Sequence, residues 1–448
     1  MRRPAPIILL LVTLWAPAAT QKIAPEVERE ARGVWITLSL ALTKQTVPQI
    51  VQQLQGHNLN LALVMYEASQ PMREFAEACR RAGIEVHVWV VPETLVPKPK
   101  EEWLVHGYSL AQKDFTARPA AFFEEEYRQA AAARAAEIMK ELPCDGLHLD
   151  GVRHGLPWDD LGPESCARFA HDTGLKVGDY RSDIVQVANL TADNIGKPNE
   201  WAGPLLPQWT RWRCQVVADL FGAMARAVKA VDGRLCVSNA CMTDWGSPMY
   251  YGVDYSLLAP HLDFLVPMAY YNRYGQDARW AIRRCHEIAL QAHAANPKCH
   301  VYAGVATYSH STCRIWIAQV TAEAQKQGKL SAEDIKSNRL LDYFTGGDML
   351  RSATWLYGHG MIEAKTYGQM LNAIITDDEI LEAVDLMRAG RDKSLPGVQE
   401  YVDEAPVEGI VFFRYFCMFP ENTEGVVGNL WDKLRPEFPK PTRLPHRQ

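Results

Sequence analysis

Short apolar runs and amphipathic segments alternate along almost the whole chain. Helical periodicity occurs over Val47–Gln55, Pro71–Gly83, Ala120–Leu142, Pro163–Thr173, Trp209–Val231 and Ala278–Ala294. The apolar runs between these segments predict eight strands: Gly33–Thr37, Leu59–Tyr66, Ile84–Val91, Gly146–Val152, Leu235–Cys241, Phe264–Tyr271, Val301–Thr307 and Gly409–Phe416. Strands separated by helices form parallel βαβ units, and eight such units predict an α/β fold, a closed (β/α)8 TIM barrel.

Two segments are too long to be simple connections in such a barrel. Residues 154–207 follow the fourth predicted strand, and a segment of about residues 309–407, in which we expect several helices, follows the seventh. Active sites of these barrels lie at the C-terminal ends of the strands, so both excursions are positioned to wall a substrate groove. We assign residues 31–425 to the barrel with its helical insertion and 426–448 to a C-terminal tail, which we expect to be frayed from Arg435 onward.

The first residues have the layout of a secretory signal peptide. Arg2 and Arg3 precede an apolar run from Ile7 to Trp15, and Ala16-Pro17-Ala18 supplies the small residues of a cleavage site. The run is shorter than the roughly 20 residues that span a bilayer, although a membrane anchor is the alternative interpretation. We therefore expect residues 1–19 to be removed, 20–30 to be a linker, and the mature protein to be secreted or periplasmic with no membrane span.

Composition and charge narrow the function classes. The 448 residues are 48% hydrophobic and carry a net charge of −6, so the chain is neither typical of disordered proteins nor basic enough to bind nucleic acid. Its ten cysteines show no CxxC pair and no Cys/His spacing typical of zinc. Most are expected to be small buried thiols, and no metal or cofactor is expected.

The segment Cys144-Asp-Gly-Leu-His-Leu-Asp-Gly-Val-Arg-His154 contains the clearest candidate for catalysis. Side chains alternate along a strand, so if Leu147 and Leu149 face the helices, His148 and Asp150 face the barrel interior. Asp150 then lies at the C-terminal end of the strand, where a carboxylate can act as a nucleophile, base or charge stabiliser. The alternative is that it only caps the following loop through hydrogen bonds.

The same segment resembles a known family. Asp145-Gly-Leu-His-Leu-Asp150 with Val152-Arg153 is similar to the fourth-strand motif of the glycosyl hydrolase-like 10 family, bacterial envelope proteins with a glycoside-hydrolase-type barrel. It is more distantly similar to the strand that carries the aspartate nucleophile in the α-amylase clan. The ordered matches continue at Ala31–Trp35, Ala82–Trp89, Asp263–Tyr270 and Gly409–Phe413, so the resemblance covers most of the chain.

The resemblance implies hydrolysis of glycosidic bonds in a polysaccharide, with peptide-free peptidoglycan glycan strands as the substrate of characterised relatives. This sequence departs from the family pattern at three positions. Gly151 replaces a frequent second acidic residue, Met268 a usual Gln, and Asn239 a usual Pro.

Glycosidases normally use two carboxylates, and the second is open here. Glu93 follows the third strand with the inward parity of Glu85, His87 and Trp89, and Asp244 lies just beyond the fifth strand. Glu67, beyond the second strand, is a further candidate. Each can equally be an ordinary loop carboxylate.

Other residues on or near the strands are candidates for substrate binding, because Trp and Tyr stack on sugar rings and His, Asn and Arg donate hydrogen bonds. The alternative for each aromatic residue is barrel core. These candidates are Trp35, His87, Trp89, His148, Arg153, His154, Asn239, Tyr270, Tyr271 and Arg414. Three more indoles, those of Trp158, Trp201 and Trp245, fall in predicted loops, where packing alone explains them less readily.

The sequence is also compatible with functions other than glycoside hydrolysis. A metal-dependent amidohydrolase would carry His-x-His at the end of the first strand, and Val34-Trp-Ile-Thr37 has none. A non-catalytic glycan-binding barrel is the main alternative, because the fifth strand lacks a Glu at its end, and a structural envelope protein is a third. The oligomeric state is not predicted.

Overall fold

The computed structural model describes residues 29–110, 112–119, 122–191, 194–243, 248–271, 277–307, 311–338, 340–341, 346–364, 366–367, 370, 377–392, 407–413 and 430–447. The predicted signal peptide and most of the linker lie outside these ranges. No helix among the described residues is both long enough and apolar enough to cross a membrane.

A parallel sheet curls into a nearly closed barrel, which confirms the predicted α/β fold. Its nine strands are hydrogen-bonded in the order β10-β11-β1-β2-β3-β6-β7-β8-β9. They are β1 (Ala31–Ile36), β2 (Leu61–Met65), β3 (Glu85–Val90), β6 (Gly146–Leu149), β7 (Cys236–Cys241), β8 (Phe264–Pro267), β9 (His300–Val301), β10 (Ala303–Ala306) and β11 (Gly409–Phe413).

Each of the eight predicted strands is present, and the seventh is divided at Tyr302. Its first part, β9, pairs with β8, and its second part, β10, pairs with β11. A bridge between Met268 and Gly304 joins the two ends of the sheet. A Cβ at Gly304 would lie 2.6 Å from the carbonyl oxygen of Pro267, so only glycine permits this close approach.

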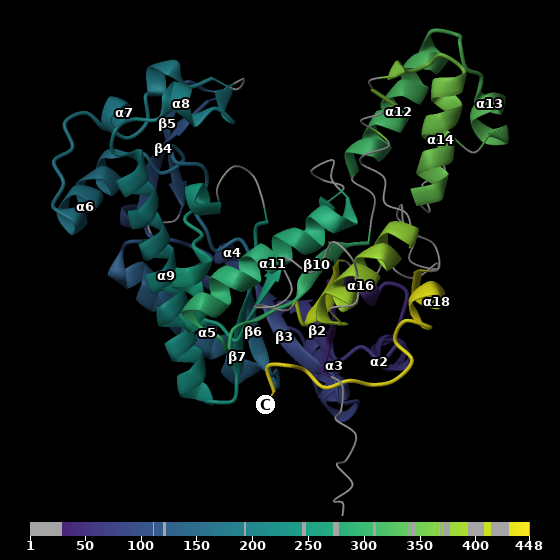
Figure 1. Ribbon diagram of the computed structural model, residues 1–448, viewed down its shortest axis with the longest axis horizontal. Helices are drawn as coiled ribbons and strands as arrows, with labels where there is room; N and C mark the ends of the chain where they lie inside the picture. Colours follow the sequence, from purple (N-terminus) through teal and green to yellow (C-terminus); the bar gives the residue numbers. More distant parts are fainter. Residues whose placement is uncertain are drawn as a thin grey trace, which may run out of the picture.

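Five of the predicted helices cover the outside of the barrel (Figure 1). They are α2 (Val47–Gly56), α3 (Gln70–Arg81), α5 (Glu125–Glu141), α9 (Leu206–Val231) and α11 (Ala278–Ala295). The sixth, α6 (Pro163–Thr173), lies in a lobe beside the barrel. Helix α3 shows why its sequence folds this way: Ser69 accepts a hydrogen bond from the Met72 amide, and Met72, Phe75, Ala76 and Cys79 bury one face at helical spacing. Single-turn helices α1 (Leu38–Ala41), α4 (Pro92–Leu95) and α10 (Tyr255–Leu258) follow barrel strands.

A β-hairpin that the sequence analysis missed forms part of a lobe beside the barrel. Strands β4 (Leu104–Ser109) and β5 (Asp114–Pro119) pair antiparallel, and the Tyr108 amide donates to the carbonyl of Trp158 in the excursion after β6. Figure 1 shows the hairpin together with α6, α7 (Tyr180–Asp183) and α8 (Pro198–Trp201). The first excursion is therefore a folded lobe that includes a hairpin from earlier in the chain.

The second excursion contains helices, as expected. Helices α12 (Ser311–Lys326), α13 (Ala332–Ser337) and α14 (Gly346–Gly358) project from the barrel in Figure 1, whereas α16 (Asp377–Asp392) packs beside α11. The projecting helices have a hydrophobic cluster of their own, which includes Ile317, Leu330 and Leu356. We call α12, α13 and α14 the helical arm.

The C-terminal tail is not frayed up to Arg447, contrary to expectation. After α18 (Leu430–Leu434), it crosses the N-terminal end of the barrel, where Phe438 and Leu444 are buried. Leu444 belongs to the same interior cluster as Leu61 and Phe264. The prolines and arginines that suggested fraying belong to an extended segment, and this segment covers the N-terminal end of the barrel.

The cysteines whose side chains are described agree with the prediction of buried thiols. All are unpaired and buried: Cys79, Cys144, Cys166, Cys214, Cys236, Cys241, Cys285 and Cys299.

Candidate active site at the C-terminal end of the barrel

The alternation predicted for the fourth strand is present. Leu147 and Leu149 belong to the large hydrophobic cluster between strands and helices, whereas Trp89 on β3 belongs to the cluster inside the barrel. His148 is the register partner of Trp89 and hydrogen-bonds across the interior. Asp150 is the first residue after β6 and continues this inward face to the C-terminal mouth.

Two donors hold the Asp150 carboxylate. The indole Nε1 of Trp89 donates to Oδ2 at 3.2 Å, and Nη1 of Arg153 lies 3.5 Å from Oδ1. The side chain keeps 19% of its surface exposed, so solvent or a ligand can reach it. The chain turns sharply at Gly151, whose φ of +69° is a conformation that glycine adopts without strain. This turn brings Arg153 back toward the carboxylate.

A column of hydrogen bonds fills the barrel below Asp150. Trp35 Nε1 donates to Nε2 of His148 at 3.2 Å, and Nδ1 of His148 lies 2.9 Å from Ser238 Oγ. Burial, followed by the nearby His87, lowers the pKa of His148 well below its usual value, so the ring is neutral. Because its Nε2 accepts from an indole that can only donate, the single imidazole proton is on Nδ1 and is donated to Ser238.

This column assigns new roles to three predicted substrate-binding residues. Trp35, His87 and His148 are at most 1% exposed, and each already has an interior hydrogen-bonding partner. Their placement therefore favours support of the mouth from below over contact with a substrate. Trp89 is 8% exposed and touches the Asp150 carboxylate, so its indole edge lies at the mouth itself.

Two further candidates lie away from the barrel interior. Asn239 is on the helix-facing side of β7, opposite in parity to Ser238 and Ala240, and its Nδ2 donates to the Leu149 carbonyl at 2.9 Å. The His154 side chain is only 3% exposed, and its Nδ1 lies 3.0 Å from Asp160 Oδ2. Neither is placed to contact a ligand beside Asp150.

Of the two aromatic candidates after β8, Tyr270 packs against the aromatic residues next to Trp89. Tyr270 stacks on Phe413 with ring centroids 5.2 Å apart, and Phe413 also contacts Trp35 and Trp89 edge-on. Tyr270 and the adjacent Tyr271 are almost fully buried. Arg414 lies outside the described residues.

The loop tryptophans of the lobe are explained by packing. Trp158 and Trp201 are 2% and 1% exposed and meet edge-on at 5.1 Å in the lobe's core. The expectation that packing alone would explain these two indoles less readily is therefore wrong. Trp245 lies outside the described residues.

The second carboxylate is not identified by contact with Asp150. The strand alternation that placed Glu93 inward ends at Val90, because Pro92 starts the short helix α4, and Glu93 is exposed. Burial and then the charge of Glu93 raise the pKa of Tyr127 to about 12, so this carboxylate lies on the side of α5. Glu67 accepts a hydrogen bond from the Ser39 amide at 3.2 Å. Asp244 lies outside the described residues.

A buried ion cluster beneath the loop after β6 was missed. Arg213 on α9 is fully buried, pairs with Asp160 at 2.8 Å, and donates to the carbonyls of Gly155 and Leu156. Asp160 in turn holds His154. The sequence did contain an indication of this cluster, because Arg213 lies on the otherwise apolar face of a long helix. A buried arginine requires a buried acidic partner. The cluster fixes the loop that carries Arg153 and thereby the donor to Asp150.

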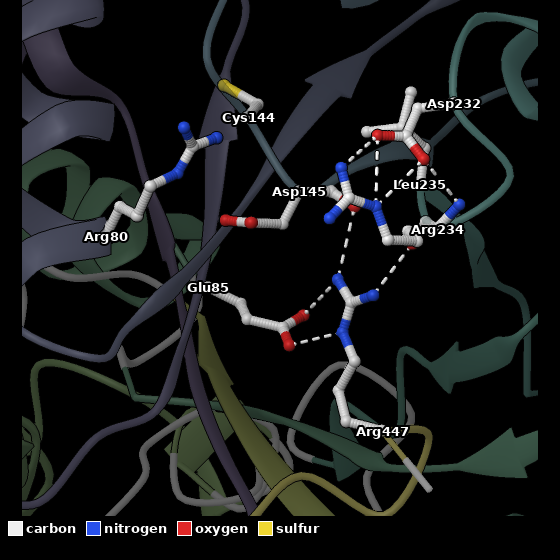
Figure 2. Close-up of a pocket in the computed structure, with 8 residues that line it drawn as sticks. All are labelled: Arg80, Glu85, Cys144, Asp145, Asp232, Arg234, Leu235 and Arg447. Atoms are coloured by element: carbon white, nitrogen blue, oxygen red, sulfur yellow. Dashed lines mark hydrogen bonds and ion pairs between the residues drawn. The ribbon is translucent and has the colours of Figure 1, made fainter.

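Cavities occur at other places on the described surface. One of about 1100 Å³ lies in the lobe, between the β4–β5 hairpin and the segment around α7, and is lined by Tyr108, Phe115 and Arg181 among others. Another of about 410 Å³ lies at the N-terminal end of the barrel, where Glu85 and Arg447 line it (Figure 2). Near this second cavity, His87, Cys236 and His446 are the one group of potential metal ligands found among the described residues.

No protein-family model matches the chain, and no curated protein matches it. Its fold is distantly similar to solved TIM-barrel glycoside hydrolases. The catalytic domain of β-amylase from Paenibacillus polymyxa aligns at 9% identity and a TM-score of 0.44, covering 92% of this chain and 98% of that chain. A β-galactosidase from Halorubrum lacusprofundi aligns at 10% identity and 0.48, covering 90% and 57%. The spore cortex-lytic enzyme SleL of Bacillus cereus aligns at 8% and 0.36, covering 63% and 52%.

These similarities concern the fold alone. The chain spans about half the length of SleL and of the β-galactosidase from Marinomonas ef1, of which it covers 48%. At such identities no active-site residue is transferred from these structures, and the site rests on the geometry around Asp150.

Proposed function

We propose that the protein is a glycoside hydrolase that uses Asp150 as one of its two catalytic carboxylates. The observation that carries the proposal is the position of this side chain. It is an accessible carboxylate at the C-terminal end of a barrel strand, oriented by Trp89 and Arg153. In this position Asp150 can act as the nucleophile or as the general base. The general acid would then be a second carboxylate, for which Glu93, Glu67 and Asp244 are the candidates.

The proposed substrate is a polysaccharide. Trp89, Phe413 and Tyr270 form a connected aromatic group beside Asp150, and aromatic rings bind the apolar faces of sugars. The sequence resemblance to the glycosyl hydrolase-like 10 family narrows the proposal to peptide-free peptidoglycan glycan strands. The signal-peptide layout of residues 1–19 agrees with an exported, cell-envelope enzyme.

Loss of the charge at Asp150 tests the proposal. We expect Asp150→Asn to reduce the release of reducing ends from purified glycan strands by at least about 1000-fold, since a catalytic carboxylate cannot be replaced by its amide. Asp145→Asn is the matched control, because Asp145 lies at the opposite end of the same strand and accepts a hydrogen bond from the Val86 amide. Equal activity of wild type and Asp150→Asn would contradict the assignment of this residue.

A non-catalytic glycan-binding barrel is the second candidate. The observation that favours it is that β7, the fifth predicted strand, has the sequence Cys-Val-Ser-Asn-Ala-Cys and ends without a Glu that could serve as the second carboxylate. Glycan binding without any release of reducing ends by the wild type would support this alternative. Substitution of Glu93, Glu67 and Asp244 by the corresponding amides, one at a time, would identify the acid if hydrolysis occurs.

A further inference from the structure

Three potential metal ligands meet at the N-terminal end of the barrel, opposite Asp150. His87 comes from β3, Cys236 from the start of β7 and His446 from the C-terminal tail. One ligand atom from each lies within 4.8 Å of the other two. His87 and Cys236 are buried, and the His446 side chain is 1% exposed.

Glu85 supplies a fourth donor atom at the same place. Its Oε2 lies 3.4 Å from Nε2 of His87 and 3.1 Å from Nε2 of His446. Ligand atoms around a tetrahedral zinc ion are about 3.4 Å apart, since each bond is about 2.1 Å long. Glu85 thus contacts both imidazole ligands, and a movement of its carboxylate toward Cys236 would complete a set of four around an ion held by His87, Cys236 and His446.

The surroundings satisfy the remaining atoms of both imidazole rings. Nδ1 of His446 lies 2.7 Å from the Tyr302 hydroxyl, and Nδ1 of His87 lies 3.5 Å from Ser238 Oγ. A histidine that binds metal through Nε2 donates its Nδ1 proton to such an oxygen. Ser238 can accept from both His87 and His148 and donate its own proton to the Leu147 carbonyl at 3.4 Å.

The charges also balance. A cysteine thiolate and the Glu85 carboxylate together neutralise a divalent ion, and the charge of Arg447, which is paired with Glu85 in Figure 2, is then offset by Asp145 and Asp232 in the same cavity. Binding releases the Cys236 thiol proton and moves one proton from Nε2 to Nδ1 in each imidazole. The cavity of about 410 Å³ beside Glu85, also lined by Asp145 and Asp232, gives the ion a route in.

We propose that Cys236, His87, His446 and Glu85 form a zinc site that fastens the C-terminal tail to the barrel. A set of one thiolate, two imidazoles and one carboxylate suits Zn²⁺, and four protein ligands leave no open position, as in structural rather than catalytic sites. Two ligands come from β3, one from β7 and one from the tail, so the ion joins segments far apart in the sequence. The site is independent of the proposed hydrolysis at Asp150.

Metal binding by the untagged full-length chain tests the proposal. After treatment with a chelator, we expect titration calorimetry to show one zinc ion bound per chain, and zinc to raise the melting temperature. Cobalt(II) in place of zinc should give the thiolate-to-cobalt charge-transfer absorption that a cysteine ligand produces. Failure of the wild type to bind zinc, or absence of this absorption, would overturn the proposal.

Two ligand variants and one control assign the site. We expect Cys236→Ser and His446→Gln each to weaken zinc binding by at least about 100-fold, and Cys236→Ser to abolish the cobalt absorption. Cys144→Ser is the matched control, since Cys144 lines the same cavity but is outside the cluster, and should bind like the wild type. Zinc affinity unchanged in both ligand variants would place the bound ion elsewhere and refute the proposal.

Discussion

Asp150 depends on a single indole, that of Trp89, for the orientation of its Oδ2. Trp89 donates to Oδ2 from the interior side, while Arg153 reaches Oδ1 from the loop. Phe413 packs edge-on against Trp89 and limits the movement of its ring. The geometry at this carboxylate is therefore fixed by hydrogen bonding and aromatic packing together.

Removal of the indole donor alone should weaken catalysis without changing the packing much. We expect Trp89→Phe to lower kcat about tenfold, equivalent to about 1.4 kcal/mol, the size of a hydrogen bond to a charged group. Trp212→Phe is the control, because its indole donates to Asp172 at 3.0 Å on the outer face of α9. Steady-state kinetics on glycan strands measure both. An equal loss in the two variants would indicate a general effect on the fold.

His154 makes the protein sensitive to mild acid. Burial, only partly opposed by Asp160, lowers its pKa below 6.5, so the unfolded chain takes up this proton more readily than the folded one. The stability supplied by neutral His154 is present above about pH 6.5 and is lost as the pH falls toward its lowered folded pKa, by up to about 1.4 kcal/mol per pH unit. Asp160 does not add to this change, because its pKa is lowered from an ordinary value near 4, outside the window.

Urea unfolding at pH 7.5 and pH 5.5 measures the effect. The free energy of unfolding should fall more steeply with acid in the wild type than in His154→Gln, which keeps a donor toward Asp160 but has no titrating group. Identical pH dependence in the two proteins would show that His154 does not titrate in this range.

At the scale of elements, an ion pair and hydrogen bonds from Arg213 connect the loop after β6 to α9. Arg213 uses its guanidinium for Asp160, in a buried contact, and for the carbonyls of Gly155 and Leu156, in partly buried ones. The loop that positions Arg153 therefore depends on one side chain from the long helix.

Replacement of this arginine should destabilise the fold strongly. We expect Arg213→Met to lower the free energy of unfolding by about 3–5 kcal/mol, because Asp160 is left as a buried, uncompensated charge. The double variant Arg213→Met/Asp160→Asn should recover part of the loss, since the isolated charge is gone. Denaturant unfolding of the wild type, Arg213→Met, Asp160→Asn and the double variant gives the coupling energy. A double variant as unstable as the sum of both single variants would contradict this account.

The elements show which features a sequence can predict. The barrel strands were found because each is a short, mostly apolar segment between helical segments. Asp150 was found because its alternation with Leu147 and Leu149 is local. The β4–β5 hairpin was missed because a half-polar stretch such as Leu104-Val-His-Gly-Tyr108 gives a weaker pattern than the buried strands.

Contacts between distant segments were beyond the sequence analysis. Glu85 and Arg447 are 362 positions apart, and Arg213 and Asp160 are 53 apart, so no local spacing announces either pair. The tail was expected to fray from its composition, yet its last residues find buried partners. The inward orientation predicted for Glu93 was wrong for a local reason. The strand alternation was extended past Pro92, where helix α4 begins.

At the scale of the whole molecule, the described residues form two hydrophobic cores outside the barrel interior. The large cluster joins the barrel to its surrounding helices and the lobe, and the smaller one lies within the helical arm. Members of the small cluster, such as Ile317 and Leu356, pack with each other rather than with the barrel. Regions unfold together when they share buried surface, and the small cluster packs within the arm. The arm should therefore unfold separately from the barrel.

We therefore expect calorimetry to resolve two transitions, with the arm melting first because its core is smaller. Leu356→Ala, a fully buried position in α14, should cost about 3 kcal/mol and lower the temperature of the first transition alone. Val384→Ala, equally buried in α16 but part of the large cluster, should lower only the second transition. A single transition that moves with either substitution would mean that the arm and the barrel unfold as one unit. Separate transitions would instead allow the arm to rearrange at little cost to the barrel that holds Asp150.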